Sequence, residues 1–181
     1  MPKVVTRARR LGLYLLVISA TAALGAWLAL ETLPAPSSVE VGLQALTQTQ
    51  FETAGGETQS LNDMTGRVLV VNYWASWCAP CRQEIPGLIA FQTTYAGKGA
   101  QVVGIAIDSA ANARDYARDL RINYPVFLGT PAELERLRTL GNKAGGLPFT
   151  LFIGRDGHLH RTHLGVVTPK MLKEVVGPLL N

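Results

Sequence analysis

The chain has 181 residues, of which 48% are hydrophobic and 17% are charged. This length and composition suit one ordinary domain with extra segments and exclude an intrinsically disordered chain. Four of the 17 Lys and Arg residues precede the first acid, Glu31, and the other 13 balance the 13 Asp and Glu residues. The net charge of +4 therefore belongs to the N-terminal tail, and the sequence predicts no nucleic-acid partner.

The first thirty residues have the pattern of a membrane anchor. Residues 1–10 hold the four basic side chains, and residues 11–30 are twenty consecutive uncharged, mostly apolar positions. A helix of that length spans about 30 Å, the thickness of the hydrocarbon core of a bilayer. Because basic residues flank a span on its cytoplasmic side, we expect a cytoplasmic tail over 1–10 and a single transmembrane helix over 11–30. The remainder is then on the periplasmic or extracytoplasmic side of the cytoplasmic (inner) membrane.

A cleaved signal peptide is the alternative for this segment. The apolar run 11–19 is followed by small residues at 20–23, which suits a cleavage site. We favour the anchor because the apolar stretch continues through Leu30, beyond the usual apolar region of a signal peptide. Both interpretations place the rest of the chain in the same compartment.

A linker over 31–50 is expected to precede a folded domain over 51–181. Residues 32–38 are rich in Pro and Ser, which is typical of a linker, and residues 39–50 allow an early strand. Gly55 and Gly56 predict a hairpin turn between two short strands.

Beyond this hairpin, runs of β-branched and aromatic residues alternate with helical patterns. This order predicts an α/β sandwich in which a central mixed sheet is flanked by helices. The strands are expected at 68–74, 101–107, 124–128, 150–153 and 158–164, and the helices at 78–95, 110–120, 131–140 and 168–180.

The two cysteines of the chain, Cys78 and Cys81, stand in the segment WCAPC, at the start of the helix expected at 78–95. Two Cys residues three positions apart in a first helical turn close a small disulfide ring with little backbone movement. At a helix N-terminus the dipole and the free N–H groups stabilise a thiolate and lower the pKa of a thiol below about 8.5. We therefore expect Cys78 to be the nucleophile and Cys81 to be the resolving thiol.

Other uses of a Cys pair fit the sequence less well. A structural zinc site needs two more Cys or His ligands, and the three His residues (158, 160 and 163) stand together in one expected hairpin. A covalent haem site needs His directly after the second Cys, where this chain has Arg82. A purely structural disulfide of this size constrains little of the unfolded chain. The pattern favours redox catalysis by the Cys78–Cys81 disulfide with no metal and no other cofactor.

Four further residues are candidates for the site. Glu84 lies one helical turn after Cys81, where a partly buried carboxylate is able to exchange a proton with that thiol; a solvated acid near a helix N-terminus is the alternative. Pro148, in the loop sequence GGLPFT, suits a cis peptide bond that presents the Leu147 backbone to an extended substrate, although an ordinary turn has the same pattern. Trp77 is expected to cover the edge of the site.

The run NYWASWCAPCRQEIP at 72–86 resembles the thioredoxin superfamily. More narrowly, it resembles the TlpA-like bacterial thiol:disulfide interchange proteins, which include the reductases of cytochrome c maturation. The likeness extends from about Phe51 to the C-terminus, through VVGIAID at 102–108, YPVFL at 124–128, GLPFT at 146–150 and FIGRDG at 152–157.

This resemblance implies a thioredoxin fold, reduction of disulfides in exported proteins, and a transmembrane electron donor. By position it implies that Cys78 is the nucleophile, Cys81 the resolving thiol, Pro148 the cis-proline and Glu84 the acid beside the dithiol. Asn72 stands where cytoplasmic thioredoxins have a buried Asp, which leaves proton transfer to Glu84.

Three functions follow as hypotheses. The first is a membrane-anchored disulfide reductase with apocytochrome c as one candidate substrate. The second is a Cu(I)-binding metallochaperone that uses the same two thiols with His163, since thiolate pairs suit Cu(I). The third is a net disulfide-forming oxidant, because the residues between the two Cys do not fix the reduction potential.

Overall fold

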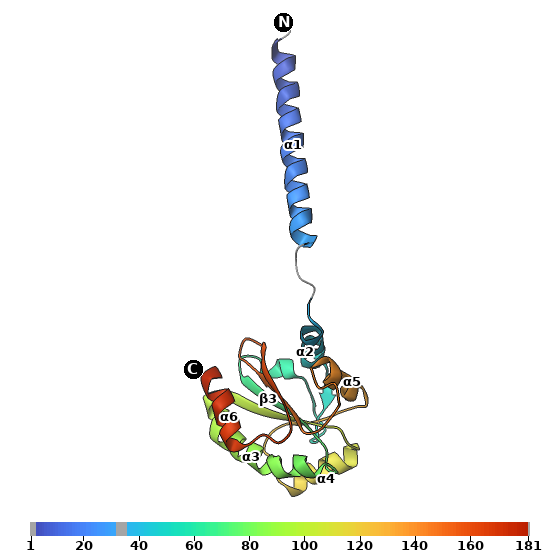
Figure 1. Cartoon of the computed structure of the whole chain (residues 1–181), viewed down its shortest axis with the longest axis vertical. Helices are drawn as coiled ribbons and strands as arrows, with labels where there is room; N and C mark the ends of the chain where they lie inside the picture. Colours follow the sequence, from blue (N-terminus) through green and yellow to red (C-terminus); the bar gives the residue numbers. More distant parts are fainter. Residues whose placement is uncertain (1–2, 32–35, 181) are drawn as a thin grey trace. The chain divides into compact units, whose positions relative to one another are not determined.

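The computed structural model describes residues 3–31 and 36–180, which fall into two compact units, Met1–Pro36 and Ser37–Asn181 (Figure 1). In the first unit, α1 (Lys3–Glu31) is one continuous helix. Its large apolar side chains between Leu13 and Leu28 are exposed. None of the helices, over the residues that are described, combines the length and the apolarity needed for a membrane span. The anchor expected over 11–30 therefore stays a prediction.

The second unit begins with a helix, α2 (Ser38–Gln48), in a region where the sequence suggested a linker over 31–50. Ser37 caps this helix by accepting the N–H of Glu40, and the Glu40 carboxylate accepts the N–H of Ser37 in return. Leu43 and Leu46 are buried in one of the two core clusters. The capping box and these apolar positions make the segment part of the domain, and residues 32–35 of the expected linker lie outside the described residues.

The central sheet is mixed, with strand order β5-β4-β3-β6-β7. Strands β3 (Val68–Trp74), β4 (Ala100–Ala106) and β5 (Val126–Leu128) are parallel, and β6 (Phe149–Ile153) and β7 (Leu159–Leu164) continue the sheet in antiparallel fashion. Every residue of β3 and β4 is buried, which is why these strands are apolar in the sequence at every position except Asn72 and Gln101. The expected hairpin is also present, as β1 (Phe51–Glu52) and β2 (Thr58–Gln59).

Helices cover both faces of this sheet (Figure 1). On one face the buried cluster contains residues of α3 (Ala79–Tyr95), α4 (Ala110–Asp119) and α6 (Pro169–Val176). On the other face it contains residues of α2, α5 (Ala132–Thr139) and the 3-10 turn η1 (Leu61–Met64). The predicted α/β sandwich with a mixed sheet is thus confirmed.

Two other 3-10 turns, η2 (Ala96–Lys98) and η3 (Gly177–Leu179), extend α3 and α6. The α-helical part of the last helix, α6, ends at Val176, before the expected end at residue 180. Pro178, in η3, has no N–H to donate to an α-helical hydrogen bond. By contrast, α3 continues through Pro86.

Candidate active site

Three loops meet at one edge of the sheet because of the strand register. Trp74, the last residue of β3, pairs with Ala106 at the end of the parallel strand β4. Tyr73 pairs with Phe149 at the start of the antiparallel strand β6. The loop that leads to Cys78, the loop after β4 and the loop before β6 therefore lie at the same edge. Residues far apart in the sequence are brought together there.

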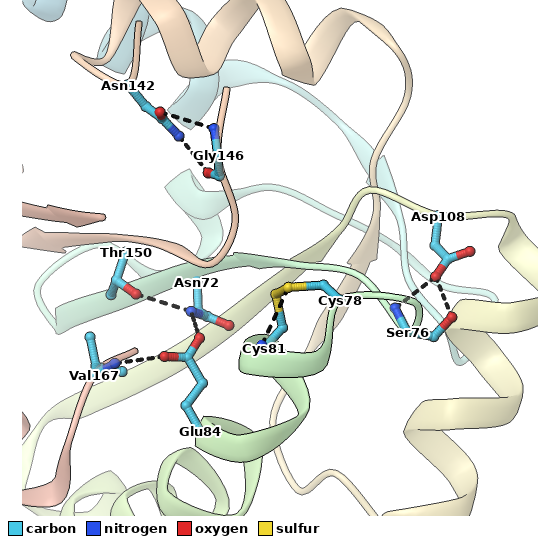
Figure 2. The surroundings of a disulfide bond; sticks show 10 residues. All are labelled: Asn72, Ser76, Cys78, Cys81, Glu84, Asp108, Asn142, Gly146, Thr150 and Val167. Atoms are coloured by element: carbon cyan, nitrogen blue, oxygen red, sulfur yellow. Dashed lines mark hydrogen bonds between the residues drawn. A yellow bond between two sulfur atoms is a disulfide. The ribbon is translucent and has the colours of Figure 1, made fainter. Parts of the chain in front are cut away.

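Cys78 and Cys81 form a disulfide, with an Sγ–Sγ distance of 2.05 Å and a Cα–Cα distance of 5.3 Å (Figure 2). Cys78 is the N-cap residue of α3, and its Sγ accepts the backbone N–H of Cys81 at 3.3 Å. Cys78 is the cysteine that reaches solvent, with 6% of its surface exposed, whereas Cys81 is fully buried. The expected position of Cys78 at a helix N-terminus is confirmed, and this position stabilises negative charge on the sulfur once the bond is reduced.

Glu84 lies one turn after Cys81 on the buried face of α3 and is only 3% exposed. Side chains of a helix lean toward its N-terminus, so the Glu84 side chain leans toward Cys81. Its Oε1 accepts Asn72 Nδ2 at 2.7 Å, and its Oε2 accepts the backbone N–H of Val167 at 2.7 Å (Figure 2). Burial raises the pKa of Glu84 to about 7, and the two hydrogen bonds oppose that rise only in part. This carboxyl group is poised to change its protonation near neutral pH.

Asn72 holds Glu84 from the central strand. Besides its bond to Glu84, its Nδ2 donates to Thr150 Oγ1 at 3.0 Å, so both amide hydrogens are used (Figure 2). The position that carries an acid in cytoplasmic thioredoxins is therefore a neutral hydrogen-bond donor here. The hydrogen bonds of Asn72 and Glu84 involve no second carboxylate.

The loop before β6 contains the predicted cis peptide bond, between Leu147 and Pro148. The buried Asn142 side chain fixes this loop, because it donates to the Gly146 carbonyl at 2.7 Å and accepts the Gly146 N–H at 3.2 Å (Figure 2). The Leu147 side chain packs against the same cluster that contains Cys78 and Cys81. Across the part of the chain that the structure describes, neither the N–H nor the carbonyl of Leu147 has a hydrogen-bond partner in the protein.

Asp108, which the sequence indicates only as a loop residue, fixes the segment before Cys78. Its Oδ2 accepts both the N–H of Ser76 at 2.8 Å and the Ser76 hydroxyl at 2.6 Å (Figure 2). Its Oδ1 accepts the N–H of Ser109 and Asn112 Nδ2. Partial burial raises the pKa of Asp108, but these bonds together outweigh it and hold the pKa below its ordinary value. No local pattern reveals this contact, because 32 residues separate its two partners.

The remaining candidates occupy different surroundings. Trp77, next to Cys78, is 68% exposed. His163 lies on β7, where its Nε2 is 3.3 Å from the Val166 carbonyl oxygen, and His160 lies near Asp156. Among the described residues there is no group of three His, Cys, Asp or Glu side chains arranged to hold a metal ion.

Comparison with known proteins shows the family to which the chain belongs. The sequence model of the AhpC/TSA family matches residues 41–162. The thioredoxin-like protein YneN of Bacillus subtilis (strain 168) is 30% identical over 141 residues, which cover 76% of this chain and 82% of YneN. The thiol-disulfide oxidoreductase ResA of the same organism is 24% identical over 125 residues, which cover 68% of each chain.

A solved structure gives the same result. A thiol:disulfide interchange protein of the thioredoxin family from Chlorobium tepidum TLS superposes with a TM-score of 0.65 and 30% sequence identity, over 74% of this chain and 93% of that one. The predicted thioredoxin-like fold and the predicted class of enzyme, a thiol:disulfide oxidoreductase, are confirmed. The chain belongs to the AhpC/TSA family, in its thioredoxin-like branch of thiol-disulfide oxidoreductases.

Proposed function

We propose that the chain is a dithiol reductase of exported proteins in which Cys78 attacks and Cys81 resolves. The observation that carries this order is the placement of Cys78 as the N-cap of α3, at the solvent side, with Cys81 buried behind it. A thiolate at Cys78 is stabilised by the N–H groups of the first helical turn. Cys81 is fully buried, so a substrate disulfide does not reach it directly. We therefore assign the resolving role to Cys81.

The reaction transfers two electrons from the dithiol to the substrate. The Cys78 thiolate attacks one sulfur of a substrate disulfide and forms a mixed disulfide, while the other substrate sulfur leaves as a thiolate. The Cys81 thiol then loses its proton to the Glu84 carboxylate, and the Cys81 thiolate attacks Cys78 Sγ. This second attack releases the second substrate thiolate and leaves the Cys78–Cys81 disulfide that the structure contains.

Glu84 suits the role of the base in the second step. Its pKa of about 7 lets it accept a proton and return it near neutral pH. It is one helical turn from Cys81, and its carboxylate is oriented by Asn72 and Val167.

The substrate surface is formed by the residues around Cys78. The main-chain groups of Leu147, which have no partner in the described part of the protein, are available to an extended peptide in the manner of strand addition. Pro148 sets the direction of that loop, and Trp77 offers an exposed apolar side chain to a protein substrate. Leu147, Pro148 and Trp77 therefore bind and align the substrate, while Cys78, Cys81 and Glu84 perform the chemistry.

The proposed location follows from the N-terminal residues. The exposed apolar side chains of α1 and the basic residues before them support a single-pass anchor over 11–30 with the domain on the extracytoplasmic side. An oxidising compartment keeps protein thiols oxidised, so a transmembrane electron donor must reduce the Cys78–Cys81 disulfide again. Apocytochrome c, whose haem-attachment motif contains a Cys pair, is one candidate substrate.

Insulin reduction tests this function with the full-length chain in a non-ionic detergent. We expect the wild-type protein to speed the reduction of insulin by dithiothreitol and the Cys78→Ser variant to have no activity. The Cys81→Ser variant should instead accumulate a mixed disulfide with the substrate, visible on a non-reducing gel. Full activity of Cys78→Ser, or accumulation of the mixed disulfide through Cys81 rather than Cys78, would contradict the proposal.

A further inference from the structure

Arg82, which directly follows Cys81 in α3, is a cation without a carboxylate partner. Its side chain is exposed, and it forms no ion pair with any residue that the structure describes. The arginines of α4 and α5, in contrast, are each paired with a carboxylate: Arg114, Arg118, Arg136 and Arg138. The charge of Arg82 is therefore available to a molecule outside the domain.

The stability of α3 gives no reason for a basic residue at this position. Arg82 lies in the first turn of the helix, which begins at Ala79. The N-terminal end of a helix has a partial positive charge, so acidic side chains are favoured there and basic ones are not. A role toward a substrate accounts for the charge better than a role in the fold.

The helix geometry brings the Arg82 side chain close to Cys78. The Arg82 backbone N–H donates to the Cys78 carbonyl at 3.2 Å, which is the bond of one helical turn. Residues four apart lie on the same side of a helix, with Cβ atoms about 5–6 Å apart, and helical side chains lean toward the N-terminus. Cys78 is also the cysteine that reaches solvent. The cation therefore lies on the side from which a substrate approaches Cys78.

A substrate joined to Cys78 is within reach of this cation. The two Cα atoms of a disulfide are usually about 4.4–6.8 Å apart, so the residues next to the substrate Cys lie near the first turn of α3. A carboxylate there is able to accept two parallel N–H bonds from the guanidinium group. An ammonium group at the same place would be repelled.

Two negative charges make Arg82 important for an anionic substrate. The attacking Cys78 thiolate is an anion, and Asp108, which bonds Ser76 two residues before it, has its pKa held below the ordinary value by its hydrogen bonds. Both charges repel a carboxylate on the substrate. Arg82 offsets this repulsion.

We propose that Arg82 determines specificity by binding a carboxylate of the substrate, next to the sulfur that Cys78 attacks. The preferred substrates are then disulfides flanked by acidic groups. This inference rests on the proposed function, in which Cys78 is the nucleophile. Arg82 forms and breaks no covalent bond; it selects and orients the disulfide before the attack.

Small disulfides of different charge test this inference with the reduced full-length chain, in a non-ionic detergent at low ionic strength. At neutral pH dithiodipropionate is a dianion, cystamine is a dication and hydroxyethyl disulfide is neutral. The rate at which each oxidises the Cys78–Cys81 dithiol is measured by acid quenching and alkylation of the remaining thiols.

The ratio of the dithiodipropionate rate to the cystamine rate should fall about tenfold in Arg82→Gln. A unit charge about 6 Å from another changes a rate by a factor of about three in water, and the two probes change in opposite directions. High salt should reduce the difference between the wild type and the variant. A change in the fold or in the thiolate fraction of Cys78 multiplies the rates with all three disulfides alike and leaves this ratio unchanged.

Two variants serve as controls. Arg82→Lys retains a positive charge at the same position and should keep most of the preference for the dianion. Arg121→Gln removes an exposed charge that lies beyond the C-terminal end of α4, while the N-terminal end of this helix follows the active-site edge. This variant should leave the ratio unchanged.

The outcomes separate this inference from the proposed function. If the wild type reduces the disulfides but Arg82→Gln has the same ratio, the inference is wrong and the proposed function stands. An equal fall of the ratio in Arg121→Gln or in Arg82→Lys would also overturn the inference. If the wild type reduces none of the three disulfides, the proposed function fails and the inference fails with it.

Discussion

Val167 donates its backbone N–H to Glu84 Oε2 at 2.7 Å, although 83 residues separate the two in the sequence. Val167 follows β7 and leads into α6, whereas Glu84 lies in the second turn of α3. The bond therefore ties the C-terminal part of the domain to the helix that carries both Cys residues. The orientation of the proposed base depends on this loop as much as on its own helix.

Glu84 should make the stability of the oxidised domain depend on pH. Its pKa in the folded protein, about 7, lies above its ordinary value of 4.5, so the folded state binds the proton more tightly than the unfolded state. Its contribution to stability is then fully present below about pH 4.5 and is lost as pH rises through 7. The difference in unfolding free energy between the wild type and Glu84→Gln should fall by about 3 kcal/mol from pH 4 to pH 8.

Urea unfolding of both proteins, followed by tryptophan fluorescence at several pH values, measures this difference. The amide side chain of the Glu84→Gln variant does not titrate, so bonds lost by the substitution shift the curve by a constant amount and do not change its slope. A difference that is independent of pH would show that Glu84 keeps an ordinary pKa.

Asp108 should stabilise the segment before Cys78. In Asp108→Asn only one of the two side-chain oxygens remains an acceptor, so bonds to Ser76 or to Ser109 and Asn112 are lost. We expect a loss of about 1–2 kcal/mol in unfolding free energy and faster hydrogen exchange at the Ser76 amide. Asp156→Asn is the control, because Asp156 also accepts a backbone N–H, from His158, but lies in an exposed turn away from Cys78. Equal exchange at Ser76 in both variants would contradict the assigned role.

Gly104 and Gly87 should respond in opposite ways to replacement by Ala. A Cβ at Gly104 meets the Trp74 indole at 2.8 Å inside the core, and such overpacking costs about 1–3 kcal/mol. A Cβ at Gly87, in α3, makes only an ordinary contact of 3.7 Å with Pro169, and Ala is favoured over Gly in a helix by up to about 1 kcal/mol. Urea midpoints should therefore fall for Gly104→Ala and rise for Gly87→Ala. A Gly104→Ala protein as stable as the wild type would mean that Trp74 and Tyr124 are able to move away from the strand.

Local patterns in the sequence predict most of the fold because the spacing of apolar residues follows which side chains are buried. The run VLVVNYW matches β3 (Val68–Trp74) residue for residue, since a strand covered on both faces is apolar at nearly every position; its one polar amide, Asn72, is buried and bonds Glu84. The WCAPC segment likewise predicts the start of a helix at Cys78, which is the N-cap residue of α3. In contrast, α2 was not predicted, although its capping box, Ser37 with Glu40, is visible in the sequence; the preceding Pro- and Ser-rich residues favoured a linker.

The parts of the site that the sequence does not predict are contacts between distant segments. Glu84 is a candidate from its spacing to Cys81, but its partners Asn72 and Val167 come from a strand and a distant loop. The bond of Ser76 to Asp108 depends on β3 and β4 ending at the same edge. The grouping of Trp74 and Tyr124 around Gly104 requires the register of the parallel pair. None of these pairings leaves a periodicity or spacing in the sequence.

The reduction potential of the Cys78–Cys81 pair tests the central claim, that the chain reduces disulfides, most directly. The full-length protein is equilibrated with mixtures of reduced and oxidised glutathione, and the free thiols are then alkylated and counted. A reductase should have a potential below about −180 mV, because about 30 mV corresponds to 1.4 kcal/mol for a two-electron couple and a lower potential drives electrons toward the substrate. A potential well above about −180 mV would contradict the account and make the protein a net oxidant.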